Sequence, residues 1–401
     1  MSVANLIGVA KTRADLHVAK HKVRYTEAQS IVPAQVVRIR MPKYDDRMLD
    51  LRNLYMCFFL QGSTTDANAC LDGQTVQTVI QRIRVLSGST VIMDLSEADL
   101  LFQSLYDLNT EVNTSVAQQY IVGDALLADK VTNFHLSAPG QQYICKLGPR
   151  GSILNCDALL PIGRLNEFTI ELTFNTAALS IYSPAPDNNA TWTITSLELH
   201  ADYIESKTIS QHFNANPFNL TVTDYSWRYA NLAAVTIGQV RWASAYTSLD
   251  QIYCILRDPT ASQLIATQNK NRVALNGSNL VKYQVLVNQQ NLYEDPILGD
   301  GSGSWEAFEE FRSAFPQVYT SKFFNSTFLA GNQWRLAVDF DGAPEAFRTG
   351  LLSGVNTGVL TNDIIWQPTF GSAVTARVDS FMCASVNVSL PGNRGDLQLT
   401  F

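Results

Sequence analysis

Short apolar or alternating runs, separated by turn residues, make up most of the chain. Runs of about four to eight residues with a period of two are typical of β-strands. They include Val36–Arg40, Ile80–Leu86, Phe168–Phe174, Trp192–Leu199, Tyr283–Val287, Trp334–Phe340 and Val386–Leu390. Turn-forming pairs such as Asp72-Gly73, Asn276-Gly277 and Pro391-Gly392 lie between the runs. The pattern predicts an all-β protein.

Two stretches follow a helical period instead. In Ser96–Leu108, Ser96 is a candidate N-cap and three leucines share one face. In Ser304–Phe315, Ser304 is the candidate cap and three phenylalanines share one face. We therefore expect one short helix in each half of the chain.

The two halves repeat each other. The strand pair Ile83–Asp94 aligns without a gap to the strand pair Tyr283–Glu294, and each pair leads into one of the predicted helices. Other matched segments follow the same order in both halves, namely Leu54–Leu60 with Ile252–Leu256 and Ser196–Tyr203 with Ser380–Asn387. This shared order indicates a duplication.

The boundary between the repeats lies in Glu205–Pro217, which is polar and aperiodic. We predict an N-terminal arm at residues 1–24, a first domain at 25–207, a linker at 208–218 and a second domain at 219–401. About eight strands and one inserted helix per half suggest two packed sheets. The predicted architecture is therefore two tandem eight-stranded jelly-roll β-sandwiches, with one short helix inserted in each.

Charge is sparse and unevenly distributed. The chain has 29 Lys and Arg against 36 Asp and Glu, and charged residues are only 16% of the total, against roughly 25% in typical soluble domains. A net charge of −7 excludes a protein that is basic throughout. Because the cores of protein–protein interfaces are depleted in charge, this composition suggests a subunit of an assembly.

The arm is the one basic cluster. Residues 1–24 carry one acidic residue, Asp15, and a net charge of +4 from five basic residues, Lys11, Arg13, Lys20, Lys22 and Arg24. Such residues could contact phosphate groups of nucleic acid or lipid. A solvated tail and an arm packed on a neighbouring subunit are the alternatives.

Other signals for chemistry or targeting are missing from the sequence. The start of the chain does not read as a secretory signal, and the densest apolar run, Leu54–Leu60, is too short to cross a membrane. The six cysteines contain no CxxC pair, so we expect free, mostly buried thiols. His17 and His21 lack the intervening glutamate of a zinc hydrolase, and no G-x-S-x-G motif occurs. We therefore expect no metal, no cofactor and no enzymatic activity.

The tandem pattern, with a strand pair leading into a helix in each half, resembles the double jelly-roll major capsid proteins of the tectivirus–adenovirus lineage and their virophage, polinton-like and phage relatives. The resemblance covers roughly residues 25–400. It implies a virion protein made inside the host cell, whose homotrimers have a pseudo-hexameric outline and tile an icosahedral shell. Neighbouring capsomers and penton or minor capsid proteins are the implied partners. The arm residues would face the genome or an internal membrane.

Two other functions remain as alternatives. One is a carbohydrate-active or amidase-type enzyme built of two jelly rolls. The other is a glycan-binding or receptor-binding spike with exposed aromatic residues. Trp227, Trp242, Trp305 and Trp366 are candidates for that role, although their apolar surroundings favour packing.

Overall fold

The structure, a computed structural model, defines most of the chain. The residues that it describes are 19–27, 30–66, 69–71, 76–102, 140–182, 189–257, 280–299, 304–314, 335–340, 354–358, 363–391 and 394–400.

The first half folds into two antiparallel four-stranded layers. One layer has the spatial order β1 (Ala19–Glu27), β11 (Thr191–Glu205), β3 (Arg47–Ser63) and β7 (Gln141–Lys146). The other has the order β2 (Val36–Arg40), β9 (Phe168–Phe174), β5 (Ile80–Ser87) and β6 (Thr90–Ser96). Short elements complete this half: β4 (Cys70–Leu71), β8 (Leu159–Leu160), β10 (Ile181–Tyr182), α5 (Ala177–Ser180) and the 3₁₀ turns η1 (Val76–Val79) and η2 (Ile162–Arg164).

The second half repeats this topology. One layer has the order β12 (Phe218–Ile237), β19 (Ile364–Leu390), β14 (Leu249–Arg257) and β18 (Arg335–Asp339). The start of β19 also lies in the other layer, between β13 (Val240–Trp242) and β15 (Leu280–Val287), and β15 pairs in turn with β16 (Gln290–Asn291). Two short strands, β17 (Ile297–Leu298) and β20 (Gln398–Thr400), pair with β15 and β19.

Each strand of the first half that builds a four-stranded layer therefore has a counterpart in the second. β1, β11, β3 and β7 correspond to β12, the end of β19, β14 and β18, while β2, β9, β5 and β6 correspond to β13, the start of β19, β15 and β16. Eight strand segments in two packed layers form a jelly roll. We call the part from β1 to β11 the first roll and the part from β12 to β20 the second roll.

The aligned strand pairs found in the sequence are equivalent hairpins. Ser87 pairs with Thr90 across a two-residue turn in the first roll, and Val287 pairs with Gln290 across a two-residue turn in the second. Gly88 has a φ of 57° in the first turn, and Asn288 has a φ of 55° in the second. Two-residue hairpin turns require such left-handed residues, so the gapless alignment of the two halves extends to the turns.

The second predicted helix is present and the first begins later than expected. α7 (Ser304–Ala314) buries Phe311 completely. In the first roll, Ser96 is not a cap, because it still pairs with Arg82 in the β5–β6 hairpin. Glu97 turns the chain with a φ of 52°, and the helix begins at residue 98. Residues 103–108 of the predicted helix lie outside the described residues.

Most of the predicted linker is helical. α6 (Lys207–Ala215) begins after Ser206, whose side chain accepts a hydrogen bond from the Ile209 amide. Ile209 and Phe213, four residues apart, pack on Met48 and Leu159 of the first roll. Two apolar residues four positions apart give little helical periodicity in an otherwise polar segment. The sequence therefore predicts an irregular linker here.

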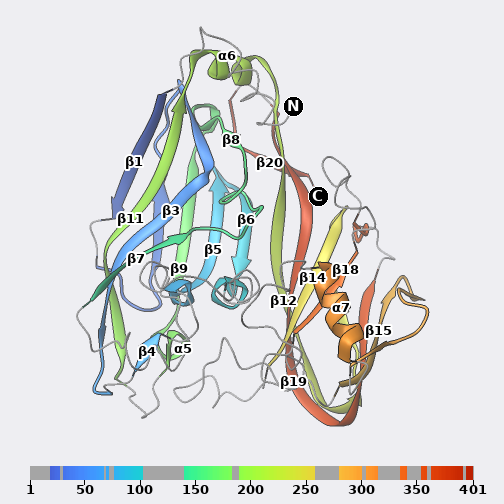
Figure 1. The fold of residues 1–401 in the computed structure, drawn as a ribbon. Coiled ribbons are helices and arrows are strands. Elements are labelled where there is room, and N and C mark those ends of the chain that lie inside the picture. Colours follow the sequence, from blue (N-terminus) through green and yellow to red (C-terminus); the bar gives the residue numbers. More distant parts are fainter. Residues whose placement is uncertain are drawn as a thin grey trace.

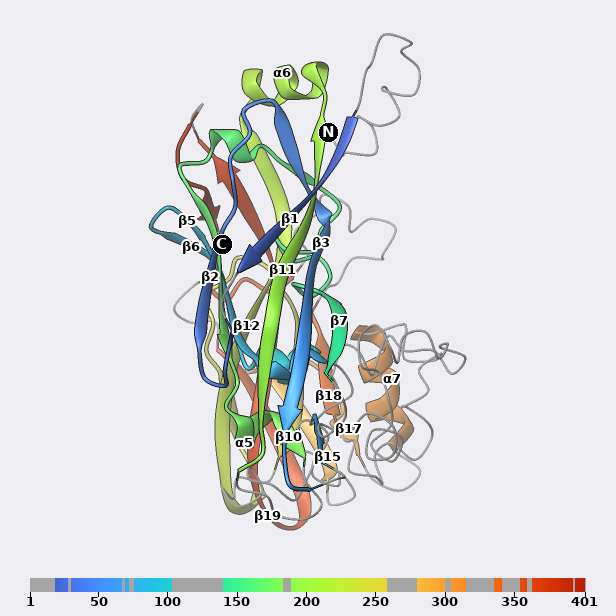
Figure 2. The ribbon, with the colours of Figure 1, turned by 90° about the vertical axis from the view of Figure 1, so that its left-hand side faces the viewer.

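The two rolls stack in the same orientation. Figure 1 shows the layer of β1, β11 and β3, then that of β9, β5 and β6, then that of β12, β19 and β14, and finally β15 at the far side. Turned by 90°, Figure 2 shows β1 beside β11 and α6 at the end of the molecule from which the second roll begins. The inner layer of the first roll, through β6, contacts β12 of the second roll.

Candidate functional site

Three of the five basic residues of the predicted arm lie in the part of the chain that the structure describes. Lys11 and Arg13 lie outside the described residues. Lys20, Lys22 and Arg24 lie in β1, where their register partners on β11 are Ile204, Asp202 and His200. Residues 19–24 of the predicted arm are therefore part of the sheet. The alternation of basic residues with His21, Val23 and Tyr25 is the sequence signal that could have identified this strand.

The candidate functional site that the structure does define is the junction between the rolls. The phenolic oxygen of Tyr225 on β12 donates a hydrogen bond to the Arg150 carbonyl oxygen at 2.8 Å. The Thr223 amide, also on β12, donates to the Gly151 carbonyl oxygen at 2.9 Å. Gly151 has a φ of +85°, and a Cβ there would lie 2.7 Å from the Thr223 hydroxyl oxygen. Glycine suits this position because of its positive φ and because a Cβ would press on the Thr223 side chain.

The C-terminal segment joins the rolls a second time. The Leu397 amide donates to the Ser87 hydroxyl oxygen at the tip of the β5–β6 hairpin, at 2.9 Å. Gly395 exchanges two backbone hydrogen bonds with the first roll, accepting from Asn166 and donating to Arg164. Because β20 pairs with β19, this segment fixes the hairpin of the first roll against the sheet of the second.

A buried ionic cluster lies in the second roll at the junction. Asp379 is completely buried, and its carboxylate accepts hydrogen bonds from Arg257 Nε at 2.7 Å and from the Trp227 indole nitrogen at 3.0 Å. Arg377 also pairs with Asp379, at 3.0 Å. From the first roll, Glu97 approaches Arg257 to 3.9 Å. A carboxylate this deeply buried is stable only because cations and donors surround it.

A cavity of about 630 Å³ lies between the two rolls. Arg82, Met93 and Asp94 line it from the first roll, while Trp227 and Tyr229 line it from the second. Asp224 lies in its wall and accepts a hydrogen bond from the Tyr246 hydroxyl at 2.8 Å. Burial raises the pKa of Asp224 above its ordinary value.

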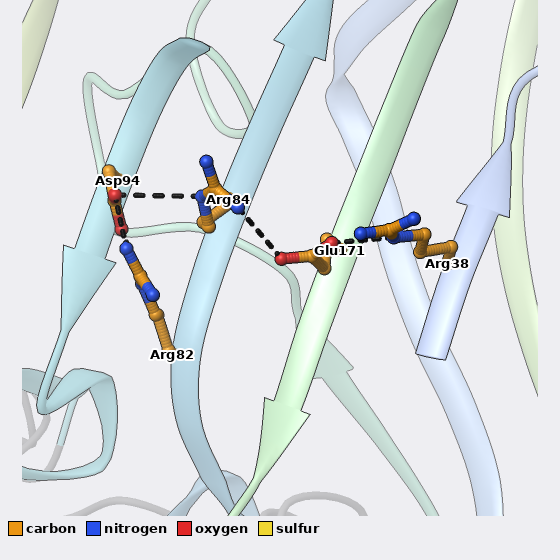
Figure 3. A network of polar contacts seen from close by, with 5 residues as sticks. All are labelled: Arg38, Arg82, Arg84, Asp94 and Glu171. Carbon is orange, nitrogen blue, oxygen red and sulfur yellow. Dashed lines mark hydrogen bonds and ion pairs between the residues drawn. The ribbon is translucent and has the colours of Figure 1, made fainter. Parts of the chain in front are cut away.

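The first-roll wall of the cavity continues as a ladder of charged side chains across β2, β9, β5 and β6 (Figure 3). Glu171 lies at the centre, with one oxygen 2.6 Å from Arg38 Nε and the other 3.1 Å from Arg84 Nη1. The Asp94 carboxylate continues the ladder. It lies 3.5 Å from Arg84 Nε and accepts a hydrogen bond from Arg82 Nε at 2.6 Å. The hydrogen bond from Arg38 is the main reason why the pKa of Glu171 is lowered. The ladder ties four strands together on one face of the layer.

Reactive chemistry is sparse in the part of the chain that the structure describes. There, no group of three or more His, Cys, Asp or Glu side chains could hold a metal ion. No helix among the same residues has the length and apolarity to cross a membrane. Five of the six cysteines are buried and all six are free, which confirms the expectation for the thiols. Burial raises the pKa of Cys254 to about 12, so that thiol is uncharged at neutral pH.

The tryptophans proposed as receptor contacts mostly pack in the core. Trp242 and Trp366 are buried in the second roll and stack with ring centroids 6.4 Å apart. Trp227 is half-buried at the junction cavity. The side chain of Trp305 lies outside the described residues.

No family profile and no curated protein matches the sequence. The structure nevertheless resembles solved viral capsids. It matches the PBCV-1 virus capsid with a TM-score of 0.66 and 11% identity, over 97% of this chain and 98% of that one. A structure of the Sputnik virophage matches with a TM-score of 0.58 and 9% identity, over 96% and 88%. The Faustovirus major capsid protein matches with a TM-score of 0.56 and 10% identity, over 95% and 94%.

These matches define the class of fold. The chain has the double jelly-roll fold of viral major capsid proteins, which confirms the predicted architecture. The likeness extends over nearly the whole of each chain and includes both rolls.

Proposed function

We propose that this protein is a major capsid protein, a structural subunit of a viral shell. The observation that carries the proposal is the match of both rolls, in one continuous superposition, to the capsid proteins of PBCV-1 and Faustovirus. In this proposal the protein is a component of the virion.

The stacking of the rolls supports a trimer. The two rolls present different faces to each other, so their contact is heterologous, and a heterologous contact repeated with a closing rotation builds a ring. Two similar rolls per chain in three chains give six similar units around one axis. Such a pseudo-hexameric trimer can tile a hexagonal lattice, and neighbouring capsomers and penton or minor capsid proteins would complete an icosahedral shell.

The N-terminal residues have a separate role in this proposal. Lys11 and Arg13, which precede β1, would contact phosphate groups of the genome or of an internal membrane. For Lys20, Lys22 and Arg24 the same role competes with one in the sheet, because these residues lie in β1. No observation on the described residues favours the enzyme or the receptor-binding spike over a capsid subunit.

Light scattering coupled to size-exclusion chromatography tests the proposal. The purified protein should elute with a mass of three times 44.4 kDa or as a larger assembly. Deleting residues 1–18 should leave the trimer intact and reduce binding to nucleic acid or to anionic vesicles. A monomer at micromolar concentration would contradict the proposed function.

A further inference from the structure

The junction cavity has no part in the proposed function, and its lining has the chemistry of a ligand site. We propose that this cavity binds a small organic cation, a primary amine with an apolar or aromatic body, whose ammonium group pairs with Asp224. The inference goes beyond the proposed function and does not depend on it, because the site lies within a single chain.

The cavity has the size of a small-molecule site. Its volume is about 630 Å³, and pockets that hold small molecules measure about 300–1,000 Å³. It lies between β6 of the first roll and β12 of the second, and Leu399 of β20 also lines it. Arg228 and Tyr229 in its wall are exposed, so a ligand can reach it from solvent along β12.

Asp224 is the carboxylate of the cavity that lacks a cationic partner among the described side chains. The groups that contact it are neutral donors, namely the Tyr246 hydroxyl at 2.8 Å and the Tyr225 amide. Asp94 in the same cavity differs, because two arginines hold its carboxylate. A partly buried carboxylate without a cation has lost hydration that the ammonium group of a ligand would compensate.

The charges around Asp224 favour a cation over an anion. Burial raises the pKa of Asp224, and the negative charge of Asp94 raises it further. The two arginines of the wall are already engaged, since Arg82 donates to Asp94 and Arg228 donates to the Trp227 carbonyl oxygen. An ammonium group beside Asp224 would therefore lie in a negative field and stabilise the charged form of the carboxylate.

Apolar side chains from both rolls provide contacts for the body of the ligand. Ile92 and Met93 of β6 lie in the wall on one side. On the other side Trp227 and Tyr229 stack with ring centroids 5.3 Å apart, and Arg377 lies 4.7 Å from the Tyr229 ring centroid. Tyr229 is 57% exposed, so its ring is available to a ligand. An apolar and aromatic lining with one well-placed charged group is typical of small-molecule sites.

Calorimetric titration with three molecules of similar size tests the site. The amine 2-phenylethylammonium should bind the wild-type protein, while neutral 2-phenylethanol and anionic phenylacetate should bind at least about tenfold more weakly. Asp224→Asn should weaken binding of the amine by about tenfold or more, because it removes the charge and keeps the shape. Asp363→Asn is the matched control, since it removes an exposed carboxylate that pairs with Arg241, and it should leave the affinity unchanged.

Thermal unfolding gives a second measurement, because a ligand that binds the folded state stabilises it. The amine should raise the Tm of the wild-type protein and not that of Asp224→Asn. Equal affinity of the amine for the two proteins, equal binding of phenylacetate and the amine to wild type, or no binding of the amine would each overturn the inference.

Tyr229→Ala keeps the test decisive if Asp224→Asn does not fold. Removal of this exposed ring should weaken binding of the amine by about threefold or more, because the ligand loses part of its aromatic wall. An unchanged affinity would place the amine outside the junction cavity and overturn the inference. The mass of the wild-type assembly is measured separately, so none of these results bears on the proposed function.

Discussion

Tyr225 on the first strand of the second roll donates its hydroxyl hydrogen to the Arg150 carbonyl oxygen of the first roll, at 2.8 Å. Tyr225 is buried, and burial raises its pKa, so the hydroxyl keeps its proton and remains a donor at any physiological pH. This bond lies beside the close approach of Thr223 to Gly151. Together these contacts hold the two rolls in one orientation.

Tyr225→Phe should lower the free energy of unfolding by about 1 kcal/mol, because the buried Tyr225 side chain loses its hydrogen bond to the Arg150 carbonyl. Urea unfolding measures the change. Tyr229→Phe is the matched control, since Tyr229 lies on the same strand and is exposed, and it should have little effect. Equal losses in the two variants would show that the Tyr225 bond does not stabilise the junction.

Asp379→Asn should destabilise the protein more strongly, by about 3–5 kcal/mol, because Arg257 and Arg377 would lose the charge that neutralises them. The matched control is Asp363→Asn. Asp363 pairs with Arg241 at the surface, and an exposed pair contributes about 1 kcal/mol or less. Thermal unfolding of both variants distinguishes the buried cluster from the exposed pair, and a loss for Asp379→Asn no larger than for Asp363→Asn would contradict the account.

Glu171→Gln should reduce stability at neutral pH, by about 1 kcal/mol or less because Arg38 is largely exposed. The pKa of Glu171 is lowered from its ordinary value of 4.5, so its charged form stabilises the folded state above that value. This stabilisation is lost as the pH falls through the lowered pKa. The difference between wild type and variant, measured by urea unfolding over a pH series, should therefore disappear in acid. A difference that persists unchanged at low pH would contradict the role of the charge.

Asp224→Asn should behave in the opposite way. The pKa of Asp224 is raised above 3.8 by burial, so the folded protein holds its proton more tightly than the unfolded chain does. The stability of the wild type therefore falls as the pH rises from 3.8 through the raised pKa. Relative to wild type, the variant should gain stability over this window, while its side-chain oxygen can still accept the Tyr246 hydrogen bond. A relative loss with rising pH would contradict the assignment.

The local patterns of the sequence predict much of the fold. Period-two alternation identifies strands such as Phe168–Phe174, and the gapless match of Ile83–Asp94 to Tyr283–Glu294 predicts two equivalent hairpins that the structure confirms. The helix Ser304–Ala314 is equally local, because its apolar face lies in one short segment. Because matched segments follow the same order in both halves of the chain, the architecture is limited to two similar rolls.

The junction could not be predicted from such patterns. Asp379 and Arg257 are separated by more than a hundred residues, and nothing local distinguishes them from surface charges until the strands pair. The sequence of β1 resembles that of a solvated arm because its basic residues alternate with others and it lacks a long apolar run. β1 joins the sheet by pairing with β11, which is the last strand of the first roll in the sequence.

Negative-stain microscopy of the purified wild-type protein tests the central claim most directly. If the two rolls of each chain and those of its neighbours stack in one repeated orientation, two-dimensional averages will show three-fold particles with a hexagonal outline and six similar lobes. Averages dominated by isolated two-lobed particles, at concentrations where capsid proteins assemble, would contradict the claim.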